Sequence, residues 1–187
     1  MHSTYTAIID ANVFYSARLT HLVMMLHREG VFRARWTNKI HDEWIKSVHK
    51  RKSVPLDQLH ARRDAMAEKA EDALVAGYER LMCGIELPDP NDRHVVAAAV
   101  LTCANAVVTF NIRDFPTEVM GPLRLEVLHP DDFFLAQFEA HSAKFLKAFK
   151  EVLSILDLDI DNALMDYHKS QIPRTVALLT RYKHCFQ

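Results

Sequence analysis

Apolar residues in the first part of the chain fall into short runs separated by longer helical stripes. Ala7, Ile8 and Ile9 form the first run, and both isoleucines are β-branched. A run of this length predicts a strand that is buried on both faces, as in a parallel sheet. Three further segments predict strands: the alternating residues 31–36 and the apolar residues 106–110 and 125–128.

Between these strands, apolar residues recur at helical spacing. The pattern predicts helices over residues 13–28, with Gly30 as the stop, over residues 38–48 after a cap at Thr37 or Asn38, and over residues 56–81 and 91–103. Alternating strands and helices favour an α/β fold, and we expect a three-layer α/β/α sandwich with a central parallel sheet.

From about residue 138 onward the pattern is helical only. We therefore expect an α/β domain over residues 1–137 and a C-terminal helical extension over residues 138–187. The apolar stripe around Phe145 and Phe149 must cover something, because it is too apolar to remain in water. Its own core, a second copy of the chain and a partner protein all remain open as the surface that it covers.

Composition indicates how large a core the chain can form and in which compartment we expect it. The chain has 187 residues, 49% of them hydrophobic, and a formal net charge of -1, so it can bury a sizeable core and carries no global basic field. Its three cysteines are far apart, which favours a reducing cytoplasm over a disulfide framework. No apolar stretch is long enough for a membrane span, and the N-terminus lacks a signal-peptide pattern. We expect a cytoplasmic protein.

Four acidic residues can be placed near one edge of the predicted sheet. Asp10 follows the first strand, Glu43 lies in the helix after the second, and Asp92 and Asp114 flank the third. Each alone has an ordinary explanation as a helix cap, a solvated acid or a complement to a helix dipole. Together their charges would repel one another unless a divalent cation neutralised them, and all-oxygen ligands favour Mg²⁺ or Mn²⁺.

Basic residues concentrate in residues 46–63. Against Asp57 alone, this segment holds Lys46, Lys50, Arg51, Lys52, Arg62 and Arg63, a balance of +5, so the rest of the chain sums to -6. A basic run of this kind is either a solvated face or a local surface for phosphates.

Four motifs, IIDANVF, RWTNKIHDEW, PDPNDRHVVAAA and VTFNIRDF, follow one another in this order. Together they resemble the PIN domain, and specifically the VapC toxins of toxin–antitoxin pairs, over roughly residues 5–135. The resemblance makes residues 1–137 a PIN-like nuclease domain. The helical tail resembles an extension that a subset of these toxins carries.

The resemblance implies a metal-dependent endoribonuclease that uses Mg²⁺ or Mn²⁺. Asp10, Glu43, Asp92 and Asp114 correspond to its catalytic and metal-binding acids, with Asn12, Asp89, Thr109 and Asn111 as supporting polar residues, Asp89 being either a ligand or only a helix cap. Arg93 and Arg113, next to two of the acids, are candidates for phosphate contacts, as is the basic segment. The implied partners are RNA, a VapB-like antitoxin and a second copy of the chain.

Two other functions remain open at this point. A haloacid-dehalogenase-like phosphatase would use Asp10 as nucleophile, but its Asp-x-Asp pair would need an aspartate where this chain has Asn12. A PIN-like scaffold that only binds is the other, and the presence of all four acids counts against it. We assign the helical tail no catalytic role, because it supplies no acid at the motif spacing.

Overall fold

The structure, a computed structural model, describes residues 5–186 and is built on a five-stranded sheet with the order β3-β2-β1-β4-β5. The strands are β1 (Thr6–Ile9), β2 (Arg33–Thr37), β3 (Leu74–Val75), β4 (Ala106–Val108) and β5 (Glu126–Leu128). Every pairing is parallel, with Ile8 of β1 opposite Arg35 of β2 and Val107 of β4. The strand β1 is therefore central, as its fully apolar run predicts.

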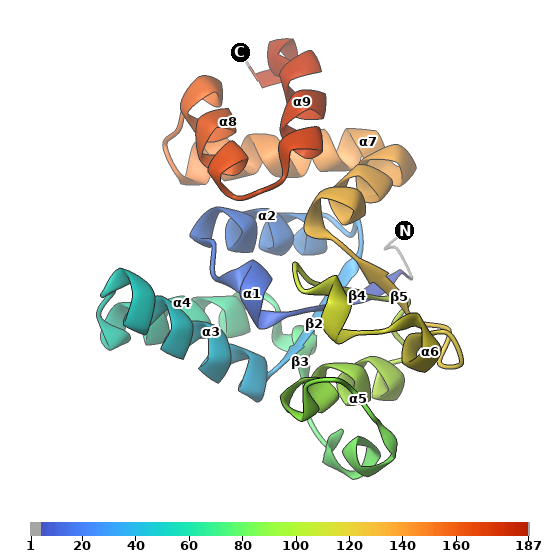
Figure 1. Cartoon of the computed structure of the whole chain (residues 1–187). Coiled ribbons are helices and arrows are strands. Elements are labelled where there is room, and N and C mark those ends of the chain that lie inside the picture. The colour runs from blue at the N-terminus through green and yellow to red at the C-terminus, as the bar shows by residue number, and fades with distance from the viewer. Residues whose placement is uncertain (1–4, 187) are drawn as a thin grey trace.

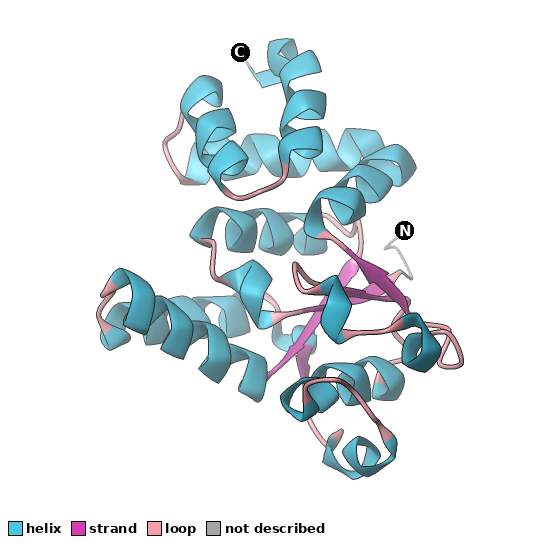
Figure 2. Ribbon diagram, in the orientation of Figure 1, coloured by secondary structure: helices cyan, strands magenta, loops and turns pink. Residues whose placement is uncertain are grey.

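Helices cover both faces of this sheet, as Figures 1 and 2 show. Helix α2 (Ala17–Arg28) and the start of α7 (Pro130–Ile155) lie on one face, and α5 (Arg93–Leu101) lies on the other. Helices α3 (Asn38–Lys52) and α4 (Leu56–Lys69) pack together beside α1 (Ala11–Phe14), and the short α6 (Thr117–Met120) precedes β5. The predicted α/β/α sandwich with a parallel sheet is confirmed.

The predicted long helix over residues 56–81 is wrong. Helix α4 ends at Lys69, and the chain continues through a 3-10 turn, Glu71–Ala73, into β3. Leu74 and Val75 pair with Trp36 and Thr37 at the edge of the sheet. A two-residue strand with one exposed leucine carries no readable alternation, so its pattern merges with that of the preceding helix.

The predicted helix over residues 13–28 is interrupted near its start. Asp10 caps α1, and Ser16 then caps α2 by accepting a hydrogen bond from the Leu19 backbone N–H. Gly30, with φ of 66°, follows the end of α2 as expected. The break turns the chain between strand β1 and helix α2, and it leaves Tyr15 and Ser16 beside the carboxyl end of the sheet.

The C-terminal helices fold back onto the chain's own core. Phe145 and Phe149 on α7 are fully buried, and helices α8 (Ile160–Lys169) and α9 (Pro173–Arg181) pack against α7. Phe149 meets Tyr167 of α8 at 5.5 Å between ring centroids. The predicted domain boundary at residue 137 falls inside α7, shortly before the non-helical residue His141, and it stays a prediction.

A buried carboxylate fixes the start of α9. Asp131, at the start of α7, accepts hydrogen bonds from the backbone N–H groups of Arg174 (2.9 Å) and Thr175 (2.7 Å) and from the Thr175 hydroxyl (2.7 Å). The cap position of α9 is Ile172, which has no side-chain acceptor. Asp131 therefore supplies from another helix the acceptor that the N-terminus of α9 needs.

In the described part of the chain, no helix combines the length and apolar character that crossing a membrane requires. Cys83, Cys103 and Cys185 are free thiols.

We expect Asp131→Asn to lower the free energy of unfolding by about 2 kcal/mol, because hydrogen bonds to a charged group contribute about 1.5–3 kcal/mol. Urea denaturation measures the loss, and hydrogen exchange of residues 173–181 should rise with it. The neighbouring variant Asp132→Asn is the control, since Asp132 is half-exposed and its ion pair within residues 5–186 is with Arg174; its effect should stay within about 0.5 kcal/mol. Equal stability of the two variants would contradict the assigned cap.

Candidate active site

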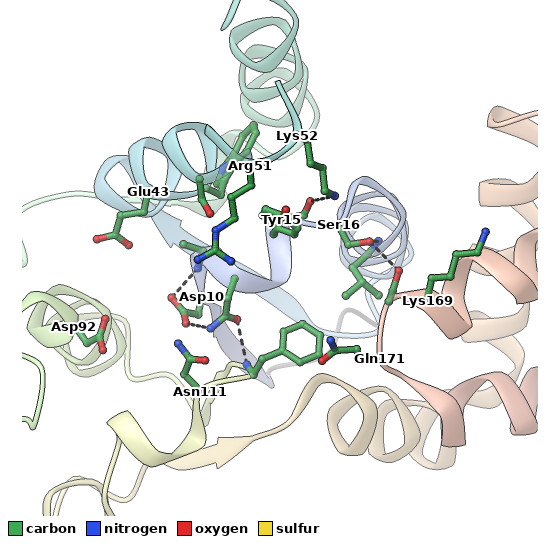
Figure 3. Close-up of a pocket in the computed structure, with 17 residues that line it drawn as sticks. Asp10, Tyr15, Ser16, Glu43, Arg51, Lys52, Asp92, Asn111, Lys169 and Gln171 are labelled. Atoms are coloured by element: carbon green, nitrogen blue, oxygen red, sulfur yellow. Dashed lines mark hydrogen bonds between the residues drawn. The ribbon is translucent and has the colours of Figure 1, made fainter. Parts of the chain in front are cut away.

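A cavity of about 670 Å³ opens at the carboxyl end of β1 (Figure 3). Three of the four predicted acids line it: Asp10, Glu43 and Asp92. It is also bordered by Ala11, Asn12, Tyr15, Ser16, Leu19, Trp44, Ser47, Arg51, Lys52, Phe110, Asn111, Lys169, Ser170 and Gln171. Ligands bind at this edge in open α/β sheets, so the cavity is the candidate active site.

Asp10 is the buried centre of the cavity wall, with 6% of its surface exposed. One carboxylate oxygen accepts a hydrogen bond from the Ala11 backbone N–H (2.7 Å), and the other accepts from the Asn12 amide (2.7 Å) and the Thr109 hydroxyl (2.7 Å). Burial raises the pKa of Asp10 above its ordinary value, while these hydrogen bonds act in the opposite direction.

Asn12 and Thr109 join this carboxylate to the loop that follows β4. The Asn12 amide nitrogen also donates to the Thr109 hydroxyl (2.8 Å), and its oxygen accepts from the Phe110 backbone N–H (3.1 Å). The Asn111 backbone N–H donates to Thr109 as well (3.0 Å). Three of the four supporting residues predicted from the sequence therefore lie within one hydrogen-bonded network, Asn12 and Thr109 through their side chains and Asn111 through its backbone, and this network fixes the rotamer of Asp10.

Glu43 is held from outside the cavity by a histidine that the sequence analysis missed. His94 is fully buried on α5, and its Nε2 lies 3.1 Å from Oε1 of Glu43. Its Nδ1 lies 3.4 Å from the Thr37 hydroxyl, which in turn caps α3. A single histidine among the buried alanines and valines of α5 was the available signal.

Asp92 is a second acid of the cavity whose pKa is raised. Its pKa is raised to about 7, first by partial burial and then by the charges of Asp10, Asp89, Asp114 and Glu43. The acids therefore act on one another electrostatically, as the sequence predicts. A nearby cation would therefore stabilise the Asp92 carboxylate more than it would stabilise an ordinary surface acid.

Asp114 and Asp89 lie at the margin of this group. Asp114 is half-buried in the 3-10 turn Ile112–Asp114, and Asp89 is exposed; neither is among the described residues that line the cavity. Asp89 caps the turn Pro90–Asp92 by accepting from the Asn91 backbone N–H at 2.8 Å. This contact gives Asp89 a role as a cap, and a role for either acid as a ligand stays a prediction.

The donor set fits a hard divalent cation. Within residues 5–186, no three His, Cys, Asp or Glu side chains form a ready-made metal cluster. Mg²⁺ does not require one, because it keeps several waters and binds through one or two carboxylates together with substrate phosphates. Asp10 and Asp92 both have raised pKa values, and such a cation would stabilise their charged forms. Glu43 lies beside them.

The basic residues of the segment 46–63 lie partly on the cavity wall and partly elsewhere in the molecule. Arg51 and Lys52, at the end of α3, line the cavity, and the Arg51 guanidinium points into it above Asp10 (Figure 3). Lys52 lies 4.0 Å from the centre of the Tyr15 ring, and burial together with Arg62 lowers its pKa. Lys46 and Lys50 are exposed on α3 and are not among the described residues that line the cavity.

Arg62 is engaged inside the fold. Its guanidinium donates hydrogen bonds to the Phe14 carbonyl (2.5 Å) and to the Thr20 hydroxyl, and it lies 4.5 Å from the centre of the Trp44 ring. Burial lowers its pKa to about 10. Arg62 thus fastens α4 to α1 and α2, and we do not retain it as an RNA contact.

The remaining basic candidates also lie apart from the cavity lining. Arg63 pairs with Asp64 at 2.8 Å, and Arg113 is exposed in the turn after β4. Arg93 is half-buried, and its Nε is buried without a hydrogen-bond partner. Their contacts with phosphates stay predictions.

One wall of the cavity comes from the C-terminal extension, which the sequence analysis did not foresee. Lys169, the last residue of α8, and Ser170 and Gln171, which follow it, line the cavity opposite the acids (Figure 3). Sequence spacing offers no signal for this, because it depends on how the tail packs in three dimensions.

The fold and site together define a class: an α/β protein whose carboxylates gather at the carboxyl edge of a parallel sheet. The comparison with protein-family models names the family, since the PIN domain model matches residues 6–113, more than half of the chain. The chain belongs to the PIN domain family, which confirms the resemblance noted in the motifs.

A curated relative is similar over the same region. A protein of Mycobacterium tuberculosis (strain ATCC 25618 / H37Rv) named "Putative ribonuclease VapC50" is 35% identical over 115 residues. The match covers 58% of this chain and 65% of that protein, so it spans just under two thirds of the relative. No solved structure matches the chain.

Because the pKa of Asp92 is raised, we expect the free energy of unfolding of the metal-free protein to depend on pH. The folded state holds the Asp92 proton up to pH about 7, whereas an unperturbed aspartate releases it near 3.8. The contribution of Asp92 to the free energy of unfolding must therefore fall as pH rises between these values. Asp92→Asn removes this loss and should be more stable than wild type at pH 8, by about 1–2 kcal/mol after allowance for solvent screening of a half-buried carboxyl.

Urea denaturation in chelator at pH 8 and pH 4 measures this difference. The comparison at pH 4 is the internal control, because the side chain of residue 92 is then neutral in the folded state of both proteins and the advantage should shrink. Added Mg²⁺ at pH 8 should narrow the gap by stabilising wild type. A stability difference that is independent of pH would contradict the predicted electrostatic coupling.

Proposed function

We propose that this protein is a metal-dependent endoribonuclease and the toxin of a VapBC-type toxin–antitoxin pair. The observation that carries the proposal is the cavity where Asp10, Glu43 and Asp92 meet, with Arg51 and Lys52 on the adjoining wall. Membership of the PIN domain family and similarity to a VapC protein support the same activity.

In this proposal, Asp10 and Asp92 would hold Mg²⁺ or Mn²⁺, with Asp114 as a further candidate. When bound, such an ion makes water more acidic and polarises a phosphodiester. Glu43, steadied by His94 at 3.1 Å, would ligate the ion or orient the attacking water and accept its proton. RNA cleavage would leave a 5′-phosphate and a 3′-hydroxyl.

Arg51 and Lys52 would contact phosphates of the RNA on the side of the cavity that adjoins α3. Cations are needed here because the acids alone would repel a polyanion. A VapB-like antitoxin would be the protein partner, and a second copy of the chain would complete a homodimer. Both belong to the proposal by resemblance to VapC toxins.

The phosphatase alternative fits less well. Asn12 stands where that reaction needs a second aspartate, and its side chain donates to Asp10 and Thr109 while accepting from Phe110. An amide with both ends engaged in this way cannot act as a general acid. The observed role of Asn12 is to orient the Asp10 carboxylate.

We expect Asp10→Asn to lower kcat for cleavage of single-stranded RNA by more than about 100-fold, since changes to outer-shell partners of a metal alone cost 10–100-fold. Gel analysis of RNA with Mg²⁺, with Mn²⁺ and with chelator measures it. Asp57→Asn, an exposed acid on α4, is the matched control and should cleave like wild type. Wild-type rates from a folded Asp10→Asn protein would refute the nuclease proposal.

We expect Arg51→Gln to weaken binding of single-stranded RNA and to reduce the slope of log K against log salt by about 0.7, the value for one lost phosphate contact. Titration of a labelled RNA at several salt concentrations measures both quantities. Lys50→Gln is the control, because Lys50 is the adjacent residue and is exposed outside the cavity. If the two variants have the same slope, the cavity wall has no special role in binding RNA.

A further inference from the structure

The α8–α9 connection, defined as the last residue of α8, Lys169, together with Ser170 and Gln171, is the part of the C-terminal extension that reaches the active-site cavity. Lys169, Ser170 and Gln171 line it from the side opposite Glu43 and Asp92 (Figure 3). They add an ammonium, a hydroxyl and an amide to a site whose other cations, Arg51 and Lys52, come from α3. The extension thus contributes polar side chains to the site, although it contributes no acid.

This connection is held firmly against the nuclease domain. The hydroxyl oxygens of Ser16 and Ser170 lie 3.0 Å apart, and Arg18 pairs with Asp166 at 2.9 Å. The hydroxyl of the fully buried Tyr167 donates to the Arg18 carbonyl at 3.1 Å. These contacts dock α8 on α2, so the wall is in place before any substrate arrives.

Gln171 occupies a backbone conformation that does not suit its residue type. Its φ is 61°, in the left-handed region, where a residue with a Cβ is less stable than glycine. The following residue, Ile172, is fully buried and fixes the chain at this point. A glutamine here sets an amide, which can both donate and accept, on the cavity wall.

The two sides of the cavity carry different kinds of side chain. Carboxylates gather where Asp10, Glu43 and Asp92 lie. On the opposite side the Gln171 amide faces the cavity, and the exposed Lys169 ammonium lies at its rim, 3.4 Å from Asp166 and away from the side of the three acids. The Tyr15 and Phe110 rings also line the cavity. Phosphate, base face and base edge of a nucleotide match an ammonium, an aromatic ring and an amide respectively.

We propose that the α8–α9 connection binds the nucleotide next to the scissile phosphate, with Lys169 on the flanking phosphate and Gln171 on the edge of the base. This rests on the proposed ribonuclease function and adds to it a contact with one flanking base, whose Watson–Crick edge an amide can reach only when the base is unpaired. Lys169 and Gln171 would contact the substrate away from the reacting atoms, so they affect binding and the choice of site more than the chemical step.

The first test is binding of a labelled single-stranded RNA in chelator, which requires no cleavage. Lys169→Gln should weaken binding several-fold and lower the salt slope by about 0.7. Lys150→Gln, an exposed lysine of α7 outside the cavity lining, is the matched control and should bind like wild type. Equal affinity of both variants, or absence of binding by wild type, overturns the proposal.

Gln171→Gly provides the second test, because glycine removes the amide and relieves the backbone strain at once. Its stability should equal or exceed that of wild type, so a loss of function cannot be attributed to misfolding. With Mg²⁺ and an RNA of mixed sequence, we expect altered base preference at the cut site and a KM raised several-fold, with kcat within about twofold. An unchanged cleavage pattern and KM overturn the role of Gln171.

The two proposals fail in different ways. If wild type binds RNA through Lys169 but does not cut it with Mg²⁺ or Mn²⁺, the nuclease function is wrong and the binding role of the connection stands. If wild type cuts RNA and both loop variants behave as wild type, the nuclease function stands and the binding role is wrong.

Discussion

The site depends on keeping one carboxylate, that of Asp10, in a buried position at the centre of a sheet. Burial disfavours its charged form and raises its pKa. Three donors counter this cost: the backbone of Ala11, the amide of Asn12 and the hydroxyl of Thr109. Two of these donors lie within two residues of Asp10. The strand-to-helix turn therefore places the acid in its buried position and also supplies two of its hydrogen-bond donors.

The third donor ties the acid to the order of the strands. Thr109 follows β4, which pairs with β1 in parallel register, so residues 99 positions apart in sequence meet at 2.7 Å. The same register brings the Phe110 backbone N–H to Asn12, and within the loop after β4 the Asn111 backbone N–H donates to Thr109. Strand order therefore does more than form a core; it supplies the polar partners that keep Asp10 in one orientation.

The sequence predicts those features that follow from local chemistry. Apolar runs that end in Asp10 and Thr109 give the central strands and the acidic edge, because parallel strands end at one side of a sheet. The edge strand Leu74–Val75 is too short to show a period, and so it was predicted as helix. The cap that Asp131 provides for α9, and the histidine behind Glu43, need tertiary proximity that no spacing encodes.

The same limit explains why the extension was assigned no part in the site. Its apolar stripe predicts burial but does not identify the surface that it covers. In the folded chain, that surface includes α2, whose N-cap Ser16 lies beside Ser170. Helix α2 follows α1, which Asp10 caps. A short path of contacts thus joins the buried acid to the tail, so a change in how α8 packs would shift one wall of the cavity without altering any of its carboxylates.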